Sequence, residues 1–355
     1  MEQVKVGVVG VGRMGQRHCR IFSNLRRAQL VGVCDALPEL GEQVARQYGV
    51  PSYTRIDDVF KHVDAVILAT PTPLHYELAM SCLAAGVHVL IEKPITETVA
   101  QAEALTRAAE ASGLVVCVGH IERFNPTYLE LKNILEDLTV LSVDVRRLGA
   151  YSHSTNDVDV VLDLMIHDID LVSDLIRQEP TWIDAHGLSA FNGSVDHAIA
   201  HLIYEAGPLV TMTASRITEQ KIRSIDVTAQ EAYVEGDLLN KSIAVHRCTT
   251  AEYLLHIRRG VKYRQESLVE RIYVPIFEPL FLELQHFVEC LADGKLPTVP
   301  ARDGLKALRL AGDIRAAIHE RLIEVKRPVA GMSERLAIPD SAMASRQESV
   351  SLSEA

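Results

Sequence analysis

Between residues 4 and about 120, short apolar runs alternate with stretches that show the 3.6-residue period of amphipathic helices. The apolar runs are almost continuous, which is typical of strands that helices cover on both faces of a parallel sheet. Two of the helical stretches end at Gly49 and Gly113, where glycine readily adopts the left-handed C-cap conformation. The predicted strands span residues 4–9, 30–35, 64–70, 88–94 and 114–120.

After Pro126 the pattern changes. A helix over 125–138 precedes a strand over 141–148 and a strongly apolar helix near 160–177. The segments that follow show partial alternation of apolar and polar residues, which favours a largely antiparallel sheet. These predicted strands span residues 182–190, 197–204, 208–217, 222–230 and 268–274, and two further helices are expected near 278–293 and 301–320.

The two patterns predict an α/β protein with two domains, as the length of 355 residues allows. We expect the first domain over residues 1–121, with a parallel sheet, and the second over 122–330, with a mostly antiparallel sheet. Residues 331–355 are Ser-rich and lack an apolar period, so they are expected to form a disordered tail.

Net charge, apolar run lengths and cysteine spacing exclude several classes of function. The formal net charge of -11 argues against nucleic-acid partners, whose phosphates require clustered Lys and Arg. No apolar run is long enough to cross a bilayer and no signal peptide is apparent, so we expect a cytoplasmic protein that does not contact membranes. The six cysteines form no C-x-x-C or zinc-type spacing, which indicates reduced thiols, mostly buried, and no metal site.

A glycine-rich turn follows the first predicted strand and opens a helix, which is the context of a dinucleotide-binding fingerprint. Gly10 would form the tight turn, Gly12 would admit a pyrophosphate, and Gly15 would let the helix pack closely on the strand. Asp35 ends the second strand, where its carboxylate can bind the ribose hydroxyls and repel a 2′-phosphate, so NAD is favoured over NADP. The predicted phosphate loop comprises Gly10, Val11, Gly12, Arg13, Met14 and Gly15.

Two further segments carry candidate chemistry. Lys93 lies at the C-terminal end of the fourth predicted strand, where open α/β sheets bind ligands. Asp163 and His167 are four residues apart on a polar stripe of an apolar helix, so the carboxylate could orient the imidazole as a base. A solvent-facing stripe or a capped, buried histidine is the structural alternative, whereas no third ligand supports a metal site.

The segments GVGRMG, ATPTPLHYELAMSCLAAGVHVLIEKPI and LDLMIHDIDL together resemble the glucose-fructose oxidoreductase, inositol dehydrogenase and MocA family. The resemblance covers about 320 residues and implies a Rossmann domain followed by an α/β domain with a large open sheet. It also implies that Lys93, Asp163 and His167 are catalytic, with His167 as the acid/base. The residues it places along the nicotinamide side of NAD are Thr70, Pro71, Thr72, His75, Glu92 and Lys93.

Within the family, the segments GHIERFNP and DVVLDLMIHDID resemble enzymes that oxidise the 3-hydroxyl of UDP-N-acetylglucosamine to a ketone. In those pathways an aminotransferase then installs an amino group for lipid A or surface glycans. The chain lacks paired glycines before Asp163, which argues against a simple polyol dehydrogenase. The side chains expected at the substrate, besides His167, are Glu122, Arg123, Asn125 and Arg147, with Lys93, Arg123 and Arg147 near the diphosphate.

Two other functions remain open from the sequence. One is an NAD-dependent inositol or free-sugar dehydrogenase, and the other is a non-catalytic NAD-binding sensor or scaffold. The open sheet of the second domain leads us to expect a homodimer or homotetramer. The arginines at positions 123 and 147 could equally form surface ion pairs.

Overall fold

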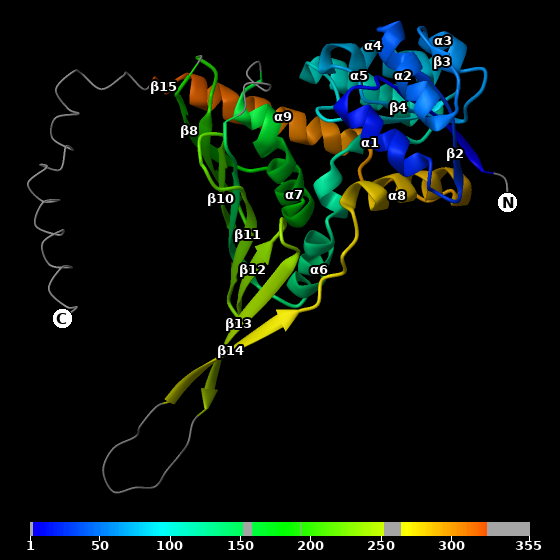
Figure 1. Ribbon diagram of the computed structural model, residues 1–355. Helices are drawn as coiled ribbons and strands as arrows, with labels where there is room; N and C mark the ends of the chain where they lie inside the picture. The colour runs from blue at the N-terminus through cyan, green and yellow to red at the C-terminus, as the bar shows by residue number, and fades with distance from the viewer. Residues whose placement is uncertain (1–2, 152–157, 192, 252–263, 325–355) are drawn as a thin grey trace, which may run out of the picture.

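The computed structural model describes residues 3–151, 158–191, 193–251 and 264–324, and the predicted tail lies outside these ranges. Within them the chain forms two β-sheets with helices packed around and between them (Figure 1). The two-sheet α/β architecture predicted from the sequence is therefore confirmed.

The first sheet is parallel and has six strands in the order β3-β2-β1-β4-β5-β6. All five predicted strands are present, and nearly all their residues are buried, as expected for strands covered on both faces. The two-residue edge strand β3 was not predicted, because it is too short to show a period. The strands are β1 (Val4–Val9), β2 (Ala28–Cys34), β3 (Ser52–Tyr53), β4 (Ala65–Leu68), β5 (His88–Glu92) and β6 (Val116–Gly119).

The helices that connect these strands end where the sequence indicates. Gly49 and Gly113 adopt the left-handed conformation at the ends of α2 and α5. Thr98 and Gln101 form a reciprocal capping box at the start of α5, which satisfies two backbone N–H groups. The connecting helices are α1 (Arg13–Phe22), α2 (Pro38–Tyr48), α3 (Ile56–Val59), η1 (Thr72–Leu74), α4 (His75–Ala84) and α5 (Val99–Ser112).

The second sheet has nine strands in the described residues, in the order β14-β13-β12-β11-β7-β10-β9-β8-β15. All neighbours are antiparallel except the pairs β7–β10 and β8–β15, so the mostly antiparallel sheet is confirmed. The sequence missed β12, β13 and β15. The strands are β7 (Val140–Leu148), β8 (Trp182–Ser189), β9 (His197–Ile203), β10 (Leu209–Ser215), β11 (Ile222–Ala229), β12 (Tyr233–Asp237), β13 (Ser242–Ala251), β14 (Arg264–Ile272) and β15 (Ile323–Glu324).

Helices fill the space between the two sheets (Figure 1). Helix α8 packs beneath the first sheet, where Leu284 and Phe287 join the core that contains Val6 and Leu90, although the sequence places α8 in the second domain. Helix α9 spans both halves of the molecule. These elements are η2 (Ile121–Phe124), α6 (Pro126–Leu135), η4 (Val161–Met165), α7 (Ile166–Ile176), α8 (Pro279–Asp293) and α9 (Ala301–His319).

The five cysteines whose side chains are described are free and buried. None of the described helices combines the length and the apolar character that a membrane span requires.

Candidate active site

The glycine turn has the geometry that a pyrophosphate requires. Gly10 has φ +82°, and a Cβ there would lie 2.7 Å from the Ala69 carbonyl oxygen. A Cβ on Gly15 would overlap the Gly10 carbonyl oxygen, so only glycine lets α1 approach β1 this closely. A Cβ on Gly12 would meet no atom within 4 Å, which leaves open space at the start of α1. An anion can therefore reach the positive N-terminal end of α1.

Asp35 completes this turn at the end of β2. Its two carboxylate oxygens accept hydrogen bonds from the backbone N–H groups of Val11 (2.8 Å) and Leu37 (2.9 Å). Each oxygen keeps a lone pair, so the carboxylate can still accept from ribose hydroxyls. Nearby, the buried hydroxyl of Thr70 has no partner among the described residues, which leaves it free for a ligand. The residues of this edge thus fit an NAD molecule.

The turn after β5 is supported by a buried histidine. His75 bridges two backbone carbonyls, with Nδ1 2.9 Å from the Pro94 oxygen and Nε2 2.9 Å from the Thr70 oxygen. These contacts hold the Thr70 and Lys93–Pro94 segments together, and the expected place of His75 along the nicotinamide side stays a prediction. Pro71 and Thr72 lie between these segments with more exposed side chains.

Lys93 and Asp163 meet between the two halves of the molecule. The Lys93 ammonium donates to the backbone carbonyl of Asp163 at 2.7 Å and lies 3.7 Å from its carboxylate. Burial lowers the pKa of Lys93 below its ordinary value, although the carboxylates of Asp163 and Glu92 oppose the shift. A lysine in this state supplies a neutral amine more readily than an exposed one, as proton abstraction requires.

The expected contact between the Asp163 carboxylate and the His167 ring does not form in the described residues. Residues Val161–Met165 are a π-helical turn, which widens the helix and displaces the side-chain register that an α-helix would give to positions four apart. Asp163 contacts Lys93 instead, and no described contact joins it to His167. Asp163 therefore positions Lys93 directly, across the junction between the two halves.

His167 lies close to the same charges. Burial lowers its pKa well below the ordinary value, and the positive charges of Lys93 and Arg147 lower it further. The ring is therefore neutral and can accept a proton or a hydrogen bond from a hydroxyl. Its buried Nδ1 has no partner in the described part of the chain.

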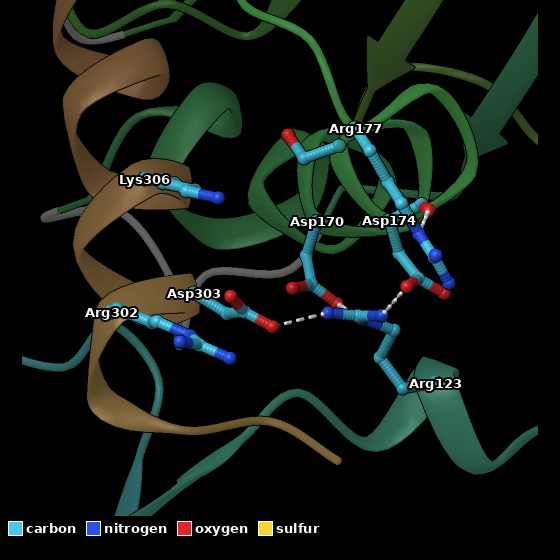
Figure 2. A pocket seen from close by; sticks show the side chains of 8 residues that line it. Arg123, Asp170, Asp174, Arg177, Arg302, Asp303 and Lys306 are labelled. Atoms are coloured by element: carbon cyan, nitrogen blue, oxygen red, sulfur yellow. Dashed lines mark hydrogen bonds and ion pairs between the residues drawn. The ribbon is translucent and has the colours of Figure 1, made fainter.

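Asp170 and Asp174 continue the polar stripe of Asp163 and His167 along α7, and both bind Arg123 (Figure 2). These contacts correct two expectations. Arg123 is buried and pairs with Asp170 (2.9 Å), Asp303 (2.9 Å) and Asp174. Asp170 and Asp174 are therefore not a solvent-facing stripe, and Arg123 offers no free charge to a diphosphate. The cavity above this cluster, about 390 Å³, includes none of the three expected catalytic residues in its lining.

Glu122, Asn125 and Arg147, which were also expected to contact the substrate, instead bind other residues of the protein. Arg147 is 1% exposed and binds Asp168 through three contacts of 2.7–3.0 Å and Glu122 at 2.8 Å. Asn125 caps α6 by accepting from the Thr127 N–H at 3.1 Å, and its amide donates to Glu122 at 2.9 Å. Because these groups satisfy one another, they hold η2, β7 and α7 together.

Comparison with known proteins agrees with this geometry. Residues 4–120 match the oxidoreductase family with an NAD-binding Rossmann fold, and residues 146–235 match the GFO/IDH/MocA C-terminal domain. The chain belongs to the GFO/IDH/MocA family. It is therefore an NAD-dependent oxidoreductase, as the sequence predicted.

Several GFO/IDH/MocA proteins resemble the chain over nearly its whole length. The UDP-N-acetylglucosamine 3-dehydrogenase of Acidithiobacillus ferrooxidans is 32% identical over 90% of this chain and 98% of its own. Its solved structure superposes with a TM-score of 0.81, covering 90% of this chain and 99% of that one. The scyllo-inositol 2-dehydrogenase (NAD(+)) of Bacillus subtilis is 26% identical over 93% of this chain and 99% of its own.

The GFO/IDH/MocA motifs did not point to two other side chains near the site. Arg223 pairs in register with Arg147 across β11 and β7, is 26% exposed, and lies 3.6 Å from Glu122. Its positive charge contributes to the lowered pKa of His167. His120, directly after β6, is buried beside Lys93 and Glu92. No motif marks an arginine within a strand. His120 lies inside the quoted segment GHIERFNP, but no spacing distinguishes it there from Glu122, Arg123 and Asn125.

The assembled site can perform proton transfer beside a bound dinucleotide. Lys93 from the first half and His167 from the second provide two buried groups whose pKa values lie below their ordinary values, and Asp163 orients the lysine. Glu92 lies beneath these groups, and its carboxylate contacts His18 Nε2 at 2.8 Å. Burial would raise the pKa of Glu92, but this hydrogen bond and the nearby positive charges hold it below its ordinary value. No group of described residues could hold a metal ion.

Proposed function

We propose that the protein oxidises the 3-hydroxyl of UDP-N-acetylglucosamine, or of a close UDP-sugar, to a 3-keto sugar nucleotide. The observation that carries this proposal is the meeting of Lys93 with Asp163 and His167 at the sheet edge that also bears the glycine turn. The relative with 32% identity, which spans 90% of this chain, supports the choice of substrate. Bound NAD supplies the acceptor for the hydride.

The protein's own groups would handle the proton and orient the hydroxyl. The neutral amine of Lys93 removes the hydroxyl proton, which raises electron density on the carbinol oxygen and favours hydride loss from its carbon. His167 accepts a hydrogen bond from the same or the adjacent hydroxyl. Asp163 holds the amine in place through contacts of 2.7 and 3.7 Å.

Arg223 is the side chain best suited to meet the diphosphate of a sugar nucleotide. Unlike Arg123 and Arg147, it is partly exposed, and its described ion pair is a single 3.6 Å contact with Glu122. Its planar guanidinium can bind phosphate oxygens in a bidentate manner. We therefore assign to Arg223 the role that the sequence suggested for Arg123 and Arg147.

A substrate panel tests the proposal. The enzyme is incubated with NAD and, separately, UDP-N-acetylglucosamine, other UDP-sugars, free N-acetylglucosamine, and myo- and scyllo-inositol. We expect NADH only with UDP-sugars and, by mass spectrometry, a product two hydrogens lighter, which an aminotransferase converts to a 3-amino sugar. NADH formation with inositols and none with UDP-sugars would overturn the assignment.

The second candidate is an inositol or free-sugar dehydrogenase, which the similarity to inositol dehydrogenases supports. A non-catalytic NAD sensor is less consistent with the site, because Lys93, Asp163 and His167 are all present and close together. Tight NAD binding without NADH formation on any member of the panel would favour the sensor.

We also propose a cytoplasmic homodimer or homotetramer that supplies an aminotransferase in 3-amino sugar synthesis for lipid A or surface glycans. Support for self-association comes from the second sheet, whose strands carry exposed apolar side chains opposite their buried ones. Trp182 is 51% exposed, and Ile203 and Leu209 are exposed on the neighbouring strands. Exposed apolar faces of this kind are typical of protein interfaces. Sedimentation of the purified protein tests this part directly.

A further inference from the structure

A cavity of about 390 Å³ lies where η2, α7 and α9 meet, and none of the three expected catalytic side chains lines it (Figure 2). Pockets of about 300–1,000 Å³ are typical of small-molecule sites. Four cationic side chains, three carboxylates and one hydroxyl line this cavity. The balance of these charges decides which kind of ligand the cavity can hold.

The three carboxylates of the lining are already compensated. The buried guanidinium of Arg123 contacts Asp170 and Asp303 at 2.9 Å each, and it also contacts Asp174. Lys132 adds a second positive charge at Asp174, at 2.6 Å. Burial raises the pKa of Asp170 to about 7 against the effect of Arg123, so this group is only partly ionised near neutral pH. The carboxylates therefore present little uncompensated negative charge to the cavity.

Two cations of the lining have no ion-pair partner in the described part of the chain. They are Arg302 and Lys306, which are exposed and lie four residues apart on α9, so their side chains share one side of that helix. Figure 2 shows both side chains extending from α9 toward the cluster around Arg123. Because like charges at this spacing repel each other, an anion bound between them would stabilise this turn of α9.

Arg177 brings a third cation from the other side of the cavity (Figure 2). It ends α7 with φ +56°, a left-handed conformation that glycine or asparagine usually adopts at this position. Among the described residues its side chain has one contact, from Nε to the Asp174 carbonyl oxygen at 3.3 Å. Both terminal nitrogens of the guanidinium are therefore available to a ligand, and the Ser173 hydroxyl belongs to the same lining.

We propose that this cavity binds a phosphate dianion, either inorganic phosphate or a phosphate monoester, between α9 and the end of α7. Guanidinium groups bind phosphate oxygens in a bidentate manner, and an ammonium group adds a compact point charge. The formal net charge of the whole chain is -11, which opposes the binding of anions in general, whereas cations outnumber carboxylates in this lining. The site is separate from the reaction proposed above and does not depend on it.

Calorimetric titration with inorganic phosphate tests the site. Saturating NAD is present throughout, so that phosphate does not bind at the glycine turn. We expect one phosphate to bind per wild-type chain. Because each cation would make charge-assisted contacts, Arg302→Gln and Lys306→Gln should each raise the Kd for phosphate by at least about tenfold. Both side chains are exposed, so neither substitution should change the melting temperature without phosphate.

The matched control is Arg309→Gln on the same helix. Arg309 is 48% exposed, binds Glu103 at 2.9 Å and does not line the cavity, so its removal should leave the Kd for phosphate unchanged. Arg223→Gln tests the alternative that phosphate binds in the catalytic cleft. Loss of binding in Arg223→Gln, with wild-type Kd values in Arg302→Gln and Lys306→Gln, would overturn the proposal. The absence of phosphate binding to the wild type would overturn it as well.

Thermal unfolding gives a second readout. Phosphate at about 100 times its Kd should raise the melting temperature of the wild type with NAD, and the same concentration should have a smaller effect on Arg302→Gln and Lys306→Gln. Equal shifts in all three proteins would contradict the site. Repeating the titration with glucose 6-phosphate separates the two sources: tighter binding of the ester indicates a phosphorylated metabolite, and equal or weaker binding indicates free phosphate.

Kinetics distinguish this site from the proposed substrate site. Arg302→Gln and Lys306→Gln should keep the wild-type KM for UDP-N-acetylglucosamine. A KM that rises together with the Kd for phosphate would make the cavity part of the substrate site and would overturn the proposal of a separate one. If the wild type oxidises no UDP-sugar, the proposed function fails while the phosphate titration is unaffected.

Discussion

Replacing Arg147 with methionine separates a structural role from a substrate-binding role. Arg147 and Asp168 are both 1% exposed, and the guanidinium also binds Glu122. Burial lowers and the two carboxylates raise the pKa of Arg147, and the net shift is upward, so the group is always charged. Methionine fills most of the same volume but leaves Asp168 buried with its charge uncompensated.

Removing one partner of a buried ion pair costs about 3–5 kcal/mol. That is about 10²- to 10³-fold or more in the ratio of folded to unfolded protein, at about 1.4 kcal/mol per factor of ten. If the urea m value is about 3 kcal/mol/M, the midpoint of unfolding should fall by about 1–2 M. Fluorescence of Trp182, the single tryptophan, or circular dichroism reports the transition.

The adjacent Arg146 is the control. It is 48% exposed and has only loose contacts with Asp144 (3.9 Å) and Asp226 (3.4 Å). Because exposed pairs contribute about 0–1 kcal/mol, Arg146→Met should leave the midpoint nearly unchanged. Arg147→Met with Asp168→Asn should recover part of the loss, because the uncompensated charge is removed. An Arg147→Met protein with normal stability and a raised KM for UDP-sugar would refute the structural role.

Two further predictions concern the cofactor turn and Lys93. Gly12→Ala adds a Cβ where the protein has no atom within 4 Å, so the melting temperature should not change. The Kd for NAD, measured by calorimetry, should rise at least about tenfold, or about 1.4 kcal/mol, and an unchanged Kd would remove Gly12 from the pyrophosphate site. The carboxylate of Asp163 raises the pKa of Lys93, so Asp163→Asn should lower that pKa further. The rise of kcat/KM with pH should then move to lower pH. A shift to higher pH would contradict Lys93 as the base.

The first sheet could be predicted well because burial on both faces imposes long apolar runs. Each of its five main strands coincides with such a run. The second sheet was harder, since β12 and β13 gain their strand conformation from pairing with neighbours: β12 has five residues, and hydrogen bonds to β11 and β13 on its two sides. A local pattern does not report such pairing.

Site residues could be predicted where the neighbouring sequence fixes their position, but not where their position depends on tertiary contacts. The glycine turn and Lys93 lie at strand ends, so their position at one sheet edge follows from topology. The partner of Asp163 depended on a π-helical turn that no residue pattern announced. Likewise, the buried partners of Arg123 and Arg147 come from α7, α9 and η2, so sequence could not distinguish these residues from the partly exposed Arg223.

The central claim is that Lys93 and His167 act together on one carbinol beside bound NAD. Single-turnover NADH formation from UDP-N-acetylglucosamine tests it most directly, in Lys93→Met and His167→Ala enzymes that calorimetry shows to bind NAD normally. Because a general base contributes about 10²–10⁴-fold, the hydride-transfer rate should fall by at least about 10² in each variant. A wild-type rate in either one, with NAD bound, would contradict the account.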